Sequence, residues 1–103
     1  MKTPKPKTKV IFRVFREGDV IALFPEIAAN ENVGICLSYQ HVGQHGGADL
    51  MGMMRLRKAT RAEYAPLASE LRRAGYNLKV IDRVQPGMMA ERRRQIARIG
   101  VAA

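Results

Sequence analysis

Two runs of alternating apolar and polar positions lie near the N-terminus. Over residues 9–16 every second side chain shares one face, which is the period-two pattern of a β-strand. Residues 16–19 contain Gly18 and predict a tight turn. Residues 19–24 return as a second strand, so the two runs predict a β-hairpin. Pro25 is predicted to end it, because proline cannot donate a ladder hydrogen bond.

The next part of the chain alternates between polar connections and short apolar runs. Residues 26–32 predict a polar connection, and residues 33–39 predict a third strand. Four glycines then predict a break in regular structure, namely Gly43, Gly46, Gly47 and Gly52. Residues 53–58 predict a fourth strand, whose outer face would be basic.

A helix is predicted to follow, starting near Thr60. Thr60 and Glu63 have the spacing of a capping box. The apolar stripe of this helix consists of Tyr64, Leu67, Ala68 and Leu71. Pro66 removes one helical hydrogen bond, so we expect a late start or a bend there. Gly75 is the expected residue after the helix.

Residues 76–84 predict a fifth strand, and residues 88–99 predict a second, shorter helix. Strands come first and helices late, which favours an α+β fold. We therefore expect a single domain with a mainly antiparallel sheet of about five strands, one main helix packed on a face and a short C-terminal helix. Its predicted parts are a basic flexible arm (1–8), the α+β domain (9–84) and a basic C-terminal helix (85–103).

The composition supports a small cytoplasmic protein. A chain of 103 residues with 47% hydrophobic residues is sufficient for one domain with one core. No apolar run approaches the length of a membrane span, so no membrane partner is expected. The basic N-terminus leads into a charged strand, which does not resemble a signal peptide. Cys36 is the single cysteine, which excludes an internal disulfide framework and fits a reducing compartment.

The net charge of +9 lies mainly at the two ends of the chain. Residues 1–9 contribute +4, residues 83–103 contribute +4, and the 73 residues between contribute +1. Basic ends favour polyanions through contacts with phosphate, although they can also serve only as solvated surface. The candidate nucleic-acid-binding residues are Lys2, Lys5, Lys7, Lys9, Arg92, Arg93, Arg94 and Arg98. No aromatic residue is interleaved with these arginines, so contacts with the backbone rather than with bases are expected.

The stretch from residue 38 to residue 49 holds both histidines and three of the nine glycines. Its polar side chains form a candidate surface for a ligand or partner. The candidates are Tyr39, Gln40, His41, Gln44, His45 and Asp49. The competing interpretation is a structural loop, in which glycines supply the turn and the Gln and His side chains satisfy backbone groups.

Chemical alternatives for this stretch have weaker support. If the glycines fold the loop back, His41, His45 and Asp49 could form a two-histidine, one-carboxylate metal set, although the spacing matches no standard zinc motif. Cys36 or Ser38 could meet a histidine as a nucleophile, but Cys36 is better explained as a core residue. Exposed N–H groups of the glycine-rich loop could bind an anion. We expect no catalytic residue, no resident metal and no cofactor.

Four segments form a distinctive pattern: IFR at residues 11–13, GDVIALFP at 18–25, SYQHVGQHG at 38–46 and GYNLKV at 75–80. In these segments the chain resembles a family of short, uncharacterised bacterial proteins carried on phages, plasmids and conjugative elements. The similarity covers roughly residues 9–83 and leaves out the basic ends. It implies a small cytoplasmic accessory protein of a mobile element, and such proteins often inhibit host defence or act as regulators.

Together these observations favour a non-enzymatic binding protein whose target is nucleic acid or a nucleoprotein complex, such as a host-defence effector of the CRISPR type. One alternative is a metal-dependent hydrolase or nuclease that uses His41, His45 and Asp49. A second alternative is a protein that sequesters a small anionic ligand. The sequence leaves the target, the oligomeric state and the relative position of the two basic ends open.

Overall fold

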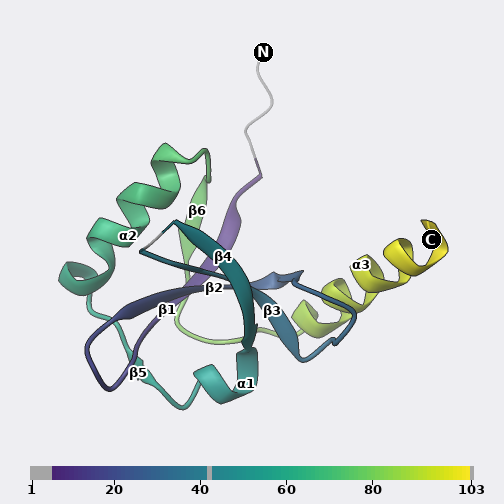
Figure 1. The fold of residues 1–103 in the computed structure, drawn as a ribbon, viewed down its shortest axis with the longest axis horizontal. Coiled ribbons are helices and arrows are strands. Elements are labelled where there is room, and N and C mark those ends of the chain that lie inside the picture. The colour runs from purple at the N-terminus through teal and green to yellow at the C-terminus, as the bar shows by residue number, and fades with distance from the viewer. Residues whose placement is uncertain (1–5, 42, 103) are drawn as a thin grey trace.

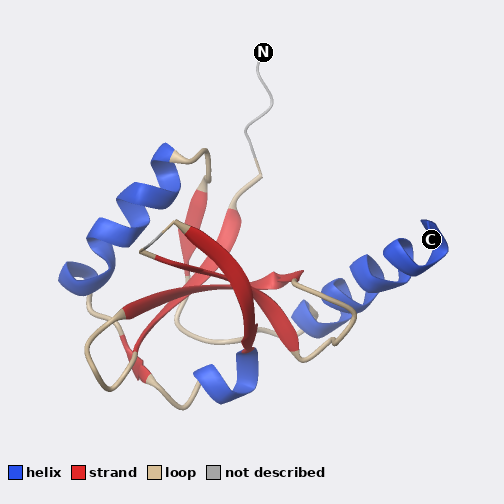
Figure 2. Cartoon of the chain, in the orientation of Figure 1, coloured by secondary structure: helices blue, strands red, loops and turns tan. Residues whose placement is uncertain are grey.

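The computed structural model describes residues 6–41 and 43–102 of the chain. Within them, six strands form one sheet in the order β4-β3-β2-β1-β5; β5 pairs with the C-terminal end of β1, and β6 pairs with its N-terminal end (Figure 1). All pairs are antiparallel except β1 with β6. Three helices accompany the sheet (Figure 2), and the fold is α+β, as the sequence predicted.

The predicted N-terminal hairpin is confirmed. Strand β1 spans Thr8–Val14 and pairs with strand β2, which spans Val20–Ala28. Gly18 lies in the turn with φ at 102°, a value that favours glycine. The prediction that Pro25 ends β2 is wrong, because the strand continues through a bulge between Phe24 and Ala28. A bulge tolerates proline because the ladder is already interrupted there.

Strand β3 spans Ile35–Gln40 and pairs with β4, Gln44–Asp49. The prediction that the glycines break regular structure is therefore wrong for residues 44–49, which form an edge strand. Of the glycines in this stretch, Gly43 adopts a positive φ of 77° at the turn. Gly46 and Gly47 pair with Ser38 and Leu37 in the ladder, so their role is in packing rather than turning.

The predicted strand at residues 53–58 is mostly wrong. A short helix, α1, occupies Leu50–Met53, and strand β5 is limited to Arg57–Lys58. Both β5 residues are exposed, so the basic outer face predicted for this strand is present, but on a shorter element. Strand β5 pairs with the end of β1 opposite Arg13 and Val14.

Helix α2 spans Arg61–Arg73, and its predicted capping box is present with both hydrogen bonds between Thr60 and Glu63. Pro66 lies inside α2 without delaying its start, and Gly75 follows the helix with φ at 109°. Strand β6 is shorter than predicted, at Leu78–Val80, because only this part pairs with β1. Helix α3 is longer than predicted, at Met88–Ala102.

The two faces of the sheet carry separate apolar clusters. On one face, which we call the α2 face, strand residues such as Phe12 and Phe24 pack against Leu67 and Leu71 of α2. The opposite face holds a second cluster: Ile11, Ile21, Leu23, Cys36, Ala48 and Leu50. Neighbouring β1 residues belong to different clusters, which confirms the predicted alternation. The first strands are therefore buried on both sides.

Candidate functional site

The polar residues at the turn end of β3 and β4 contact α2. The Tyr39 hydroxyl donates a hydrogen bond of 2.6 Å to Glu70 Oε1, and His41 Nδ1 lies 3.1 Å from Glu70 Oε2. These two contacts, the Tyr39 bond first, lower the pKa of the Glu70 carboxyl. The same bond raises the pKa of Tyr39. One carboxylate of α2 thus holds the end of the β3–β4 hairpin.

His45 belongs to a second contact on the same face. It is the cross-strand partner of Tyr39, and the two rings meet edge to face at 4.8 Å. His45 Nε2 lies 2.8 Å from the hydroxyl of Tyr76, whose ring stacks on Phe24 with centroids 5.0 Å apart. Burial raises the pKa of Tyr76. The two histidines therefore attach the hairpin to α2 and to the segment after it.

His41, His45 and Asp49 do not form one ligand set. His41 faces Glu70, His45 faces Tyr76, and Asp49 lies at the far end of β4, four residues or about 13 Å along the strand from His45. Residues 6–41 and 43–102 contain no cluster of three or more His, Cys, Asp or Glu residues that could hold a metal ion. The geometry gives no support to the hydrolase alternative.

Cys36 lies in the core beneath the sheet and is fully buried. Burial raises the pKa of its thiol to about 11, against the smaller opposing effect of Arg92. A nucleophilic cysteine needs an exposed thiolate. Cys36 is a structural residue in this fold.

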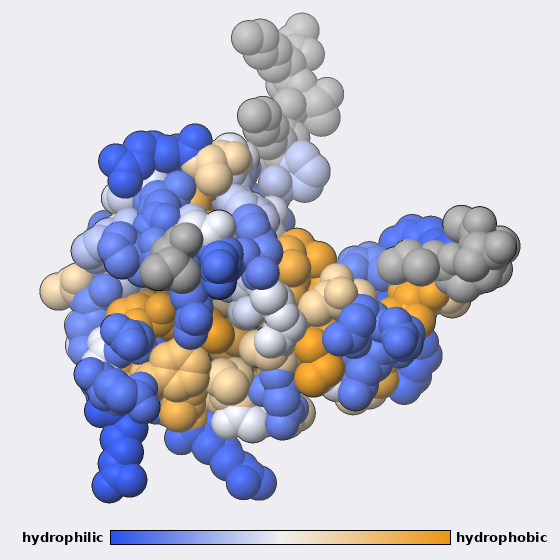
Figure 3. Space-filling view, viewed as in Figure 1, coloured by the Kyte–Doolittle hydropathy of each residue, from blue (hydrophilic) through white to orange (hydrophobic). Residues whose placement is uncertain are grey.

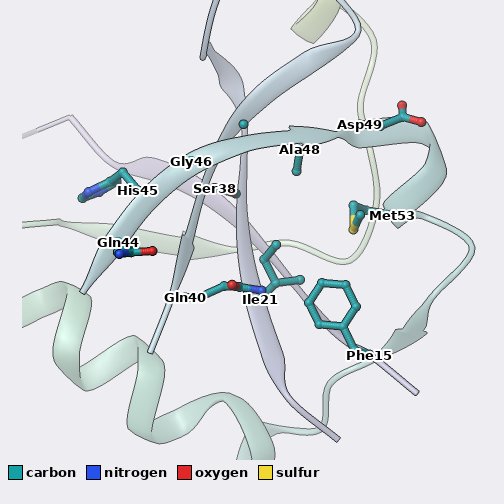
Figure 4. A pocket seen from close by; sticks show the side chains of 11 residues that line it. Phe15, Ile21, Ser38, Gln40, Gln44, His45, Gly46, Ala48, Asp49 and Met53 are labelled. Carbon is teal, nitrogen blue, oxygen red and sulfur yellow. The ribbon is translucent and has the colours of Figure 1, made fainter. Parts of the chain in front are cut away.

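The opposite face carries a groove of about 330 Å³ that extends along β4, from Gln44 beside the turn to Asp49 (Figure 4). Its apolar residues include Phe15, which follows β1, Ile21 of β2 and Met53 of α1. Polar side chains beside them are Ser38, Gln40 and Gln44. Strand pairing therefore directs Gln40 and Gln44 to one face of the sheet and His45 to the other, although His45 on the edge strand also borders this groove.

Arg92 is one of the predicted nucleic-acid-binding arginines. The prediction that its side chain is exposed is wrong, because only 2% of its surface is accessible. Its Nε donates to the Val33 carbonyl at 2.8 Å, and its Nη1 donates to the Pro25 carbonyl. Gln95, one turn later, bonds the backbone of Glu26 and Ala28. These residues fix α3 to the bulged end of β2, so Arg92 is a structural anchor.

The remaining α3 arginines are exposed. Arg94 and Arg98 both face Glu91, at 2.5 Å and 3.9 Å, and Arg93 lies beside Met89. Hydrophilic side chains cover much of the visible side of this helix (Figure 3). Arg94 is the first cause of the lowered pKa of Glu91. One carboxylate therefore faces several arginines, and the helix surface keeps a positive charge.

The described part of the N-terminal basic segment lies beside helix α3. Lys7 and Lys9 line the same hollow, of about 250 Å³, as Glu91 and Gln95 of α3. Lys9 also lies 3.9 Å from Glu26 on the floor of this hollow. Lys2 and Lys5 lie outside the described residues. We refer to Lys7, Lys9, Arg93, Arg94 and Arg98 as the basic surface.

Sequence reasoning missed several residues that organise these sites. Glu70 directly precedes Leu71 of the apolar stripe, so helical spacing alone places it beside the buried side of α2. Glu91 is one acidic residue among the arginines of α3, and the sequence does not show that it faces two of them. Tyr76 and Phe15 carried no local signal, because their contacts depend on how distant strands are arranged.

Comparisons with protein-family models, with curated proteins and with solved structures gave no match. Among the described helices, none combines the length and the hydropathy that crossing a membrane requires.

Proposed function

We propose that the protein is a non-enzymatic accessory protein that binds the phosphate backbone of nucleic acid, free or within a nucleoprotein complex, through its basic surface. The observation that carries this proposal is the shared hollow between Lys7, Lys9 and helix α3. It brings Lys7 and Lys9 to the side of α3 on which Glu91 faces Arg94 and Arg98, although these residues are distant in sequence. Clustered Lys and Arg side chains bind phosphates by displacing counterions.

The charge balance of this region supports the proposal. The basic surface has five cations, and Glu26 and Glu91 are the carboxylates that contact them, which leaves +3. Lys79 is the β6 partner of Lys9 in the parallel pair, which adds another exposed cation nearby. The sequence has no aromatic residue among the arginines of α3, so contacts with phosphate fit better than base stacking at this surface.

The proposal is tested by fluorescence anisotropy with a labelled duplex of about one helical turn. The variant Arg93→Ala/Arg94→Ala/Arg98→Ala should weaken binding by about 10-fold or more at low salt. The matched control is Arg61→Ala/Arg72→Ala/Arg73→Ala, which removes the same charge from exposed positions of α2, on the other side of the molecule (Figure 1). Equal losses in both variants would contradict a localised surface.

A gain of affinity gives a second readout. Glu91→Gln removes the carboxylate that faces Arg94 and Arg98 and keeps a side chain of similar shape. We expect tighter binding of the duplex, because both arginines become available to phosphate. Weaker binding of the duplex by this variant would contradict this expectation, because it would mean that Glu91 supports duplex binding instead of competing with phosphate.

A further inference from the structure

The groove on the opposite face contains hydrogen-bonding side chains that the fold does not use. Within the described residues, the side chains of Ser38, Gln40 and Gln44 make no hydrogen bond. Ser38 is 5% exposed and still lines the groove. Gln40 and Gln44 are exposed, and among the described residues the buried polar side-chain atom without a partner is Arg13 Nε, so these three groups are open to a ligand rather than buried and unsatisfied. These three residues thus present unused donors and acceptors to the groove.

The arrangement of these groups follows from the strand register. Gln40 and Gln44 are cross-strand partners beside the turn, and Ser38 is the partner of Gly46. Residues separated by two along a strand point to the same face, so all three polar side chains point to the groove face. Because Gly46 has no side chain, the space above Ser38 stays open. Two glutamine side chains therefore start from paired positions on this face, near the Ser38 hydroxyl.

The remaining lining is mainly apolar, although His45 also contributes to it. Ile21, Ala48 and Met53 lie beside the amides, and Phe15 adds an aromatic ring that points into the same space (Figure 4). Asp49 also borders the groove, but its carboxylate turns over α1, where a β-carbon on Gly52 would be 2.7 Å from Oδ2. The inner lining thus fits an uncharged planar group with donors and acceptors along one edge.

Cations lie close to this neutral site in the sequence. Arg16 directly follows Phe15, and Arg55 follows Met53 by two residues. Both arginines are exposed. A ligand with a neutral planar part and an anionic part would match this combination of groove and flanking charges. The groove has a volume of about 330 Å³, which lies at the lower end of the range for small-ligand sites. This volume suits a ligand with one ring system and not a folded protein.

We propose that this groove binds a nucleobase, with the base against Phe15 and its polar edge on Gln40, Gln44 and Ser38. Asn and Gln amides pair with bases through one donor and one acceptor, and every base can stack on an aromatic ring. The inference goes beyond the proposed function, because it concerns a second site on another part of the sheet. The base can belong to a free nucleotide or to a single-stranded nucleic acid.

The test uses the full chain and two-dimensional NMR of backbone amides. Adenosine monophosphate and a ten-nucleotide single strand are titrated separately. Shifts confined to the groove are expected at Ser38, Gly46, Ala48 and Met53. If only adenosine monophosphate shifts these residues, the ligand of the groove is a free nucleotide. If the ten-nucleotide strand shifts them, the ligand is single-stranded nucleic acid. If neither probe shifts these residues, or if a capped extended peptide shifts them instead, the proposal is wrong.

An occluding variant separates this site from the basic surface. A β-carbon at Gly46 would lie 3.7 Å from Ser38 Oγ, an ordinary contact, so Gly46→Leu should fold and fill the groove. Gly46→Ala is the matched control, and Phe15→Leu removes the ring while keeping an apolar side chain. We expect Gly46→Leu and Phe15→Leu each to lower single-strand or nucleotide affinity about 10-fold, with duplex binding unchanged.

The two proposals fail in different ways. Duplex binding that depends on the α3 arginines, together with unchanged single-strand and nucleotide binding in Gly46→Leu, would overturn the nucleobase site and leave the proposed function intact. Nucleotide binding that Gly46→Leu abolishes, in a protein that binds no duplex, would support the groove and overturn the proposed function.

Discussion

Gly47 lies so close to Ile35 that a β-carbon at position 47 would be 2.8 Å from Ile35 Cγ2. The neighbouring Gly46 faces the other side of the sheet, where the nearest atom to a β-carbon would be Ser38 Oγ at 3.7 Å. Two adjacent glycines in one strand therefore have different functions. Gly47 allows close packing, whereas Gly46 leaves the groove open.

These distances predict opposite outcomes for two alanine substitutions. Gly47→Ala should destabilise the fold by about 1–3 kcal/mol, because the branched Ile35 side chain cannot move away without repacking. Gly46→Ala should be neutral or stabilising by up to about 1 kcal/mol, because alanine restricts the unfolded chain. Urea denaturation monitored by circular dichroism measures both. Equal stabilities for the two variants would contradict the assigned packing.

Arg92 and Arg93 are adjacent but have different surroundings. Arg92→Ala leaves the buried carbonyls of Pro25 and Val33 without their donor, so we expect a loss of about 2–4 kcal/mol in the free energy of unfolding. Arg93→Ala should change stability by less than about 0.5 kcal/mol, since Arg93 is exposed. Thermal unfolding of the two variants under the same conditions checks this, and the reverse order would contradict the orientation of α3.

Glu63 makes the stability of α2 sensitive to acid. Arg57, which hydrogen-bonds both carboxylate oxygens, and the Thr60 backbone lower the pKa of Glu63 from 4.5 to about 2. A lowered folded-state pKa stabilises above the unfolded value of 4.5, and this contribution is lost as the pH falls toward 2.

Glu63→Gln should therefore be less stable than the parent chain at pH 6, and the difference should disappear near pH 2. The control is Glu17→Gln, since Glu17 is exposed and makes no ion pair within the described residues. Urea denaturation at several pH values gives the comparison. A stability difference for Glu63→Gln that stays constant down to pH 2 would contradict the bidentate contact.

Cys36 should be unreactive in the folded protein. A thiol pKa of about 11 leaves roughly 0.1% thiolate at pH 8, and the fully buried side chain excludes the reagent. A chromogenic disulfide reagent should react at a rate set by unfolding, and at the normal rate in 6 M guanidinium. Fast reaction without denaturant would show that β3 is not buried as described.

Local signals in the sequence predicted the elements whose partners are near in the chain. The first hairpin and α2 follow from alternation, Gly18 and the Thr60–Glu63 capping box, and all of these appear in the structure. Strand β4 was missed because its glycines are typical of a turn. Glycine is required there by contacts with the neighbouring strand: Gly47 packs against Ile35, and Gly46 leaves the groove above Ser38 open. Pro25 was misread because nothing local shows a bulge.

The candidate site was predicted in composition but not in arrangement. The stretch from Tyr39 to Asp49 does contain polar groups that contact other elements, yet strand pairing divides them between two faces. Arg92 shares its residue type with its neighbours, and only the position of α3 on β2 shows which arginine is buried. Similarly, no sequence pattern shows that Lys9 and Glu91 line one hollow.

The salt dependence of duplex binding tests the central claim most directly. For B-form DNA, the logarithm of the binding constant falls with the logarithm of salt concentration by about 0.9 per phosphate contacted. Removing Arg93, Arg94 and Arg98 should therefore reduce this slope by about 2–3, whereas the Arg61/Arg72/Arg73 control should keep the parent slope. An unchanged slope in the α3 variant, or binding insensitive to salt, would contradict the account.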